Sequence, residues 1–136
     1  MPTQNLLSCV RNDALSAILS IPKVMELSDS LPFSKTLAAA EARYKSILSN
    51  CDAIGAADGT LCLHPVSGGV LSELNNTRNP DVSKLAESVI LIDTACAVEL
   101  KRGLSCNLDA QREVKQLALE LLRLNEEQIE NMKVYL

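Results

Sequence analysis

The stretch from Pro32 to Ile54 carries apolar residues at spacings of three and four, and this pattern constrains the fold more than any other feature. The apolar positions share one helical face, and the charged residues fall mostly off it. Gly55 follows directly and suits the left-handed residue that ends many helices. The pattern therefore predicts a helix over Pro32–Ile54 with one buried face. The stripe consists of Phe33, Leu37, Ala40, Tyr44, Ile47 or Leu48, Cys51 and Ile54.

Three further long helices are predicted from the same periodicity and from the residues that punctuate it. The first covers about Gln4–Leu19, and a proline ends it before a short helix over Pro22–Leu27. Another covers Asn79–Gly103, from a good N-cap residue to a terminating glycine. The last begins near Asn107, which suits an N-cap, and continues to the end of the sequence. The chain is therefore expected to consist mainly of four long helices.

The scarcity of aromatic residues restricts how these helices can pack. Aromatic residues make up 2% and hydrophobic residues 47% of the 136 residues, so the core must consist of Leu, Ile, Val and Ala. Such a core favours close helix–helix packing over a sheet sandwich. We predict an all-α fold, an antiparallel bundle of four long helices plus one or two short helical segments, in a single domain over residues 1–136. The Asn79–Gly103 helix is apolar nearly all round, which predicts a central position.

The least regular part of the sequence is the segment from Gly55 to Gly69. It holds four of the five glycines and the single histidine. We therefore expect an irregular connection at about 55–69, with one or two helical turns over Val70–Leu74. Loops held on a rigid scaffold often carry functional sites, so this connection is a candidate location for one.

Charge and cysteine usage narrow the classes of protein that fit. Thirteen Lys and Arg against seventeen Asp and Glu give a net charge of −4, which argues against a nucleic-acid binder. The five cysteines are odd in number and lack CxxC spacing, which favours reduced cysteines over a disulfide scaffold. No signal peptide is evident, and the most apolar stretch, Leu85–Leu100, is too short and too charged to cross a membrane. We expect a cytoplasmic protein without membrane contact.

The end of the last helix is the predicted interaction surface. Because this helix is longer than its neighbours, its final turns should overhang the bundle and leave apolar side chains uncovered. Uncovered apolar surface is usually matched by a partner, which favours a homodimer. Asn125-Glu126-Glu127-Gln128 interrupts the apolar seam of the helix, which indicates a kink or a change of partner. The predicted interface residues are Leu124, Ile129, Met132, Val134, Tyr135 and Leu136.

Asp93 is the most informative acidic residue because it lies at the edge of the buried face of the most apolar helix. A buried carboxylate needs a partner, so Asp93 indicates either a structural hydrogen bond or a polar pocket. Glu87 lies on the same helix but is rotated away from it. Cys62 and His64 are two residues apart in the irregular connection and, with Asp93 or Cys106, are candidates for a zinc site or a nucleophile–base pair. We predict no metal or other cofactor, since none of these spacings is characteristic.

Four basic residues surround the turn between the last two helices. With the free N–H groups near Asn107, they are candidates for holding a phosphate or an acidic partner, but an ordinary solvated turn with one helix-end charge pair is the favoured explanation. Neither GxGxxG nor GxxxxGK[ST] is present, so no common nucleotide-binding loop is expected. The four residues are Lys101, Arg102, Arg112 and Lys115.

One local resemblance concerns the segment Lys84–Ile90, followed by Asp93 and Gly103-Leu104. It resembles the later helices of all-α nucleoside-triphosphate pyrophosphohydrolases of the MazG-like group. The resemblance implies a helical fold in which a Glu–x–x–Asp pair and a Glu-rich motif one helix earlier hold magnesium. In this sequence Lys84 and Glu87 stand at the pair, and the earlier helix has no EExxE run. The resemblance therefore implies a degenerate, inactive relative.

Two functional hypotheses follow. The first is a small cytosolic helical protein that acts by protein–protein interaction, as a regulator, adaptor or accessory factor, and that self-associates through its last helix. The alternative is a ligand-binding or metal-dependent nucleotide-hydrolysing helical domain with a polar pocket near Asp93. Because no motif identifies a chemistry, the sequence favours a non-enzymatic role.

Overall fold

A computed structural model describes residues 2–54 and 81–136 of the chain, with side chains from residue 6 onward, and in this part it is all α-helical. It contains α1 (Pro2–Leu27), α2 (Leu31–Ile54), α4 (Val82–Cys106) and α5 (Arg112–Lys133). The predicted bundle of four long helices is confirmed. The expected irregular connection at 55–69, the turns over Val70–Leu74, and the candidates Cys62 and His64 lie outside the described residues.

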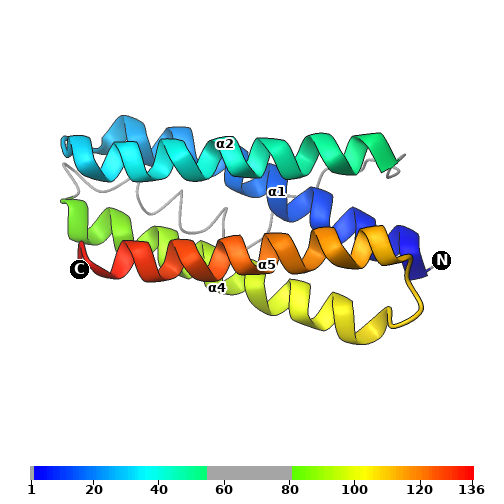
Figure 1. Cartoon of the computed structure of the whole chain (residues 1–136). Coiled ribbons are helices and arrows are strands. Elements are labelled where there is room, and N and C mark those ends of the chain that lie inside the picture. The colour runs from blue at the N-terminus through cyan, green and yellow to red at the C-terminus, as the bar shows by residue number, and fades with distance from the viewer. Residues whose placement is uncertain (1, 55–80) are drawn as a thin grey trace.

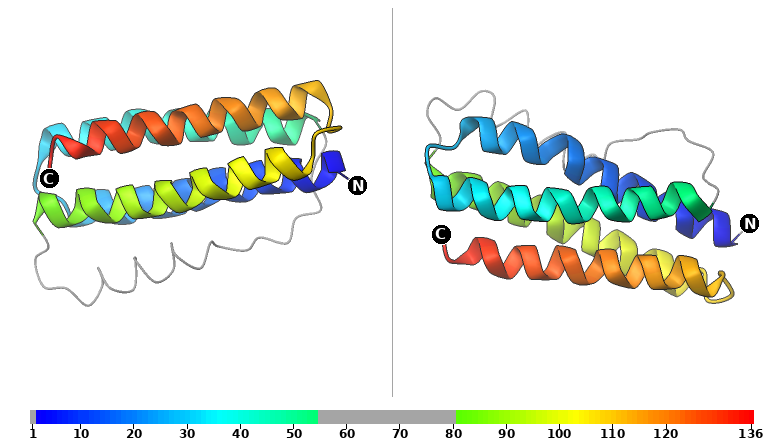
Figure 2. Two further views of the ribbon diagram at one scale, coloured as in Figure 1. Left: turned by 90° about the horizontal axis from the view of Figure 1, so that it is seen from below. Right: turned by 45° about the horizontal axis from the view of Figure 1, so that its top comes forward.

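The four helices lie side by side in the order α1, α2, α5, α4 around the bundle (Figures 1 and 2). Each helix runs antiparallel to both of its neighbours in this order. The end of α2 and the start of α4 lie at opposite ends of the bundle, so these two helices run in the same direction.

The first helix continues through Pro22, contrary to the prediction of a break followed by a separate short helix. A proline inside a helix costs about 3 kcal/mol. Ile21 and Val24 flank it and are both buried in the core. Burying each of these side chains contributes roughly 1.5–3 kcal/mol, so packing outweighs the lost backbone hydrogen bond. Pro22 itself is exposed to solvent.

The boundaries of the last two helices differ from the predicted ones. Asp81 is the N-cap of α4, and its carboxylate accepts a hydrogen bond from the Lys84 backbone N–H at 2.8 Å. Asn107 ends α4 instead of beginning the last helix, because its side-chain amide donates to the Gly103 carbonyl at 2.7 Å. The helix passes through Gly103, where an added Cβ would lie 3.4 Å from the Leu6 side chain. Gly103 therefore lies where α4 packs against α1.

The core is built from aliphatic side chains of all four helices, together with Phe33 and Tyr44. Among the described residues, α4 packs against α1 and α5. Leu91 and Val98 on α4 are about half exposed, so the described part of the chain does not show the predicted central position for this helix.

Candidate functional site

Polar side chains from every helix meet inside the bundle and form what we call the polar layer: Asp13, Tyr44, Asp93, Asn125 and Gln128. All five are buried, and both carboxyl-bearing residues are only 3% exposed. Two hydrogen bonds link the helices across the layer. The Tyr44 hydroxyl donates to Asn125 Oδ1 at 2.6 Å, and Gln128 Nε2 donates to Asp93 Oδ2 at 2.8 Å. The carboxylate expected to need a partner therefore has one.

Three buried polar atoms of this layer have no hydrogen-bond partner in the part of the chain that the structure describes. They are Asp13 Oδ2, Asn125 Nδ2 and Gln128 Oε1. Native proteins leave few such atoms unpaired, and each one calls for a physical explanation. The polar layer is thus only partly satisfied by its own side chains.

Burial shifts the protonation of both carboxyl groups in the layer. It raises the pKa of Asp13 to about 8, and the negative charge of Glu99 adds to the rise. It raises the pKa of Asp93 to about 7, although the hydrogen bond from Gln128 works in the opposite direction. Carboxyl groups with pKa values near neutrality are candidates for acid–base or proton-linked behaviour, and ordinary structural burial produces the same shift.

The thiols beside the polar layer are poor nucleophiles. Burial raises the pKa of Cys9 to about 12, and it also raises the pKa of Cys96. At neutral pH both groups are therefore thiols, whereas nucleophilic attack and metal ligation need a thiolate. Cys9, Cys51, Cys96 and Cys106 are not disulfide-bonded in the structure, and their redox state in the cell stays a prediction.

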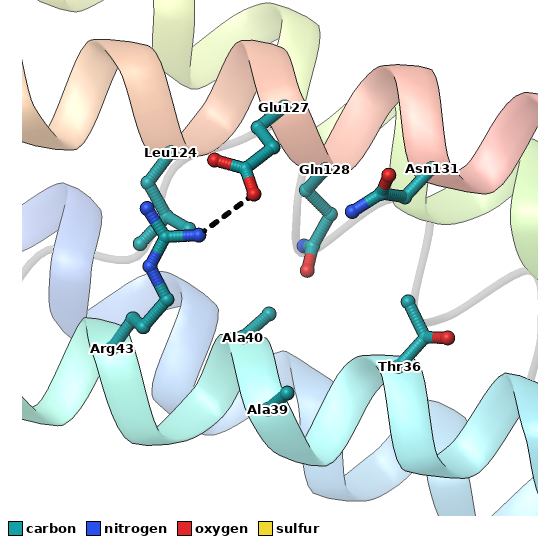
Figure 3. A pocket seen from close by; sticks show the side chains of 8 residues that line it. All are labelled: Thr36, Ala39, Ala40, Arg43, Leu124, Glu127, Gln128 and Asn131. Atoms are coloured by element: carbon teal, nitrogen blue, oxygen red, sulfur yellow. Dashed lines mark hydrogen bonds and ion pairs between the residues drawn. The ribbon is translucent and has the colours of Figure 1, made fainter.

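A groove of about 250 Å³ opens between α2 and α5, beside the polar layer (Figure 3). At one end Arg43 donates to the Glu127 carboxylate at 2.9 Å. Thr36 and Asn131 face each other across the other end. Gln128 extends from α5 toward α2 between them, so the same residue lines the groove and binds Asp93 in the core.

The polar residues singled out from the sequence do not gather into one site. Asp93 lies in the polar layer, but Glu87 is exposed on the outside of α4. Asp13, Asn125 and Gln128 were missed. Asp13 lies three residues after Val10 and four before Ala17 on the buried face of α1, a signal visible in the sequence. The interruption at Asn125–Gln128 predicts a kink or a change of partner, whereas α5 continues through it with both amides inside the bundle.

The basic residues at the α4–α5 turn do not form a shared anion site. Lys101 pairs with Glu126 at 3.8 Å, and Lys115 donates to the backbone carbonyl of Leu108. Arg102 and Arg112 face solvent. An ordinary turn with local charge pairs describes this region.

The last helix does not overhang the bundle, so the prediction that its final turns are uncovered is wrong for several residues. It is the shortest of the four described helices. Leu124 and Met132 are buried in the core of their own chain, and Ile129 is half buried. Tyr135 packs edge-on against Phe33 with ring centroids 5.1 Å apart.

Three large apolar side chains remain exposed at this end of the bundle, and we call them the apolar end. Leu31 is 65% exposed, Val134 78% and Leu136 63%. The start of α2 and the C-terminus lie at the same end of the bundle (Figure 1), where Phe33 of α2 contacts Tyr135. Two of the predicted interface residues, Val134 and Leu136, are therefore exposed at the same end as Leu31.

Two further properties concern metal and membrane. Within residues 2–54 and 81–136 no three His, Cys, Asp or Glu side chains are placed to hold a metal ion. None of the helices in these ranges has both the length and the apolar character of a membrane span.

No protein-family model, curated protein or solved structure matches the chain, so the resemblance to the pyrophosphohydrolases stays a hypothesis from the sequence alone.

Proposed function

We propose that this chain acts by protein–protein interaction, as a small cytosolic regulator, adaptor or accessory factor, and that it forms a homodimer through the apolar end. The observation that supports this most directly is the exposure of Leu31, Val134 and Leu136 at one end of the bundle. Large exposed apolar side chains that lie together usually mark a binding surface.

A second copy of the chain is the simplest occupant of this surface. In a two-fold contact the same patch faces itself, so one apolar end covers the other without any complementary feature elsewhere. Stable complexes bury about 800 Å² per partner. Three partly exposed side chains supply less apolar surface than that, so the dimer should be weak and should depend on concentration.

The test is sedimentation velocity of the full chain over a range of concentrations. The Val134→Lys/Leu136→Lys variant should weaken dimerisation roughly tenfold or more, because each lysine brings a charge into the contact. Removing the last turns of α5 would be a poor test, since it also removes the buried Met132.

Leu108→Lys is the matched control because Leu108 is 74% exposed in the turn at the other end of the bundle. It should leave the dimer unchanged. A wild-type chain that stays monomeric at every concentration, or an equal loss of dimer in the control, would reject the proposal. The second hypothesis, metal-dependent nucleotide hydrolysis, gains no supporting observation from the described residues.

A further inference from the structure

We infer that the groove between α2 and α5 is a binding site for a small neutral molecule with an amide group, in which an N–H donor stands beside a carbonyl. The site lies on the side of the bundle and does not depend on the apolar end. Three observations support it: the orientation of the Gln128 amide, the pairing of the charges in the groove, and the size of the groove.

Gln128 presents an unused acceptor on the groove side. Its Nε2 donates to Asp93 in the core, and this bond fixes which way the amide is turned. The two polar atoms of an amide point in different directions, so Oε1 is turned away from Asp93. That oxygen is buried and has no partner among the described residues, and Gln128 as a whole is 2% exposed. A ligand N–H is the group that would satisfy it.

Asn131 supplies the complementary donor. Its side chain extends into the groove with the amide nitrogen turned toward Gln128 (Figure 3). A ligand with adjacent N–H and C=O groups therefore finds an acceptor and a donor on consecutive turns of one helix. Thr36 faces this pair from α2, but its hydroxyl donates to the Pro32 carbonyl and accepts from the Tyr135 hydroxyl at 3.4 Å, so the pair itself supplies the recognition.

The charge and the size of the groove define the ligand further. Arg43 and Glu127 neutralise each other at one end, so the groove has no net charge with which to attract an ion. Ala39 and Ala40 supply a small apolar floor from α2. The volume of about 250 Å³ lies below the roughly 300–1,000 Å³ of sites for drug-sized ligands, which limits the ligand to a few linked groups or one ring.

The probe that matches this chemistry is δ-valerolactam, a single ring with one N–H beside one carbonyl. In a titration of the isotope-labelled full chain, it should cause saturable NMR shifts at the Gln128 side-chain amide and at the backbone amides of Ala39 and Asn131. The N-methyl analogue lacks the donor and should bind roughly tenfold more weakly, which is the effect of losing one hydrogen bond.

Substitutions on α2 test whether the probe binds in the groove or elsewhere on the surface, and they leave the residues of the polar layer unchanged. Ala39→Leu places a larger side chain in the groove and should abolish the shifts. Ala38→Leu is the matched control, because Ala38 is equally exposed on α2 but does not line the groove, and it should bind like the wild type. Absence of shifts in the wild type, equal binding of the N-methyl analogue, or equal loss in the Ala38→Leu control would each overturn the inference.

Discussion

Asp13 and Asp93 carry two carboxyl groups buried in the same core, but their hydrogen bonding differs. Each is 3% exposed, and neither forms an ion pair with a described residue. Asp93 receives a hydrogen bond from Gln128, whereas Oδ2 of Asp13 has no hydrogen-bond partner among the residues that the structure describes. Correspondingly, the pKa of Asp93 rises to about 7 and that of Asp13 to about 8. One neutral donor thus offsets only part of the cost of burying a carboxylate.

The comparison indicates what the polar layer contributes to the fold. A buried polar group that is only partly satisfied stabilises less than a well-packed apolar one of similar size. Pairs such as Tyr44 with Asn125 nevertheless favour one alignment of α2 against α5, because sliding either helix would leave both groups unpaired. We therefore infer that the polar layer fixes the register of the helices. Asp13 is the residue of the layer whose hydrogen-bonding groups are least satisfied.

The largest expected effect is a loss of stability as the pH rises. The unfolded chain ionises both carboxyl groups near pH 4, while the folded chain holds their protons until about pH 7 and 8. Between these limits the folded state binds more protons, so the free energy of unfolding should fall as the pH increases. Each group should contribute a few kcal/mol, a large part of a typical total of 5–15 kcal/mol. Urea denaturation at about pH 5 and pH 9 measures the difference.

Two single variants divide this effect between the groups. Asp13→Asn should remove the part of the decline that extends to about pH 8, and Asp93→Asn the part that ends near pH 7. The double variant should have a nearly flat profile between about pH 5 and pH 7, and only the smaller decline caused by the raised pKa values of Cys9 and Cys96 should remain toward pH 9. A wild-type stability that rises with pH would contradict the prediction, because it would mean that both carboxyl groups ionise readily inside the bundle.

The next effect concerns the one donor that distinguishes the two acids. Gln128→Met keeps the length of the side chain but leaves Asp93 buried without a partner, which should cost roughly 1–3 kcal/mol. The loss should be greater at about pH 8 than at pH 5, because Asp93 is then charged. Chemical denaturation at the two pH values measures it.

Gln116→Met is the control for that substitution, since Gln116 is exposed on the same helix. Surface substitutions of this kind usually change stability by less than about 0.5 kcal/mol. Equal effects at positions 116 and 128 would mean that the hydrogen bond to Asp93 contributes nothing to stability.

The fold could be predicted from the sequence because helical periodicity is a local property. The stripe from Phe33 to Cys51 is buried as predicted. The break at Pro22 was predicted wrongly because the packing of Ile21 and Val24, which overrides the proline, depends on other helices. Caps were uncertain for a related reason, since Asn107 is suited to either end of a helix and only the neighbouring turn decides between them.

The candidate site was less predictable because it depends on which helices face each other. The sequence places Asp93 on a buried face but does not name Gln128 as its partner, which lies 35 residues away on α5. The interface prediction was wrong at Met132 because the true length of α5 depends on where the preceding turn ends. The groove beside Gln128 has no local signal at all, since it exists only between two packed helices.

The smallest expected effect comes from the charge pair that lies beside the polar layer but outside it. Arg43 and Glu127 are each about half exposed, so solvent screens their attraction. Glu127→Gln should therefore change the free energy of unfolding by less than about 1 kcal/mol, and equally at pH 5 and pH 9. Glu41→Gln, which breaks the similar pair with Lys45 at 3.8 Å, is the control.

A much larger loss of stability in Glu127→Gln than in Glu41→Gln would mean that the surface charge pair and the polar layer are not independent regions. Burial raises the pKa of Tyr44, whose hydroxyl donates to Asn125, and the positive charge of Arg43 works in the opposite direction, so Arg43 already acts on the polar layer from outside. Without Glu127 that charge is unopposed at the groove. A loss of stability that depends on pH would then mean that the Arg43–Glu127 pair and the polar layer interact electrostatically. The difference between Asp13 and Asp93 would in that case depend on charges outside the core as well as on the hydrogen bond from Gln128.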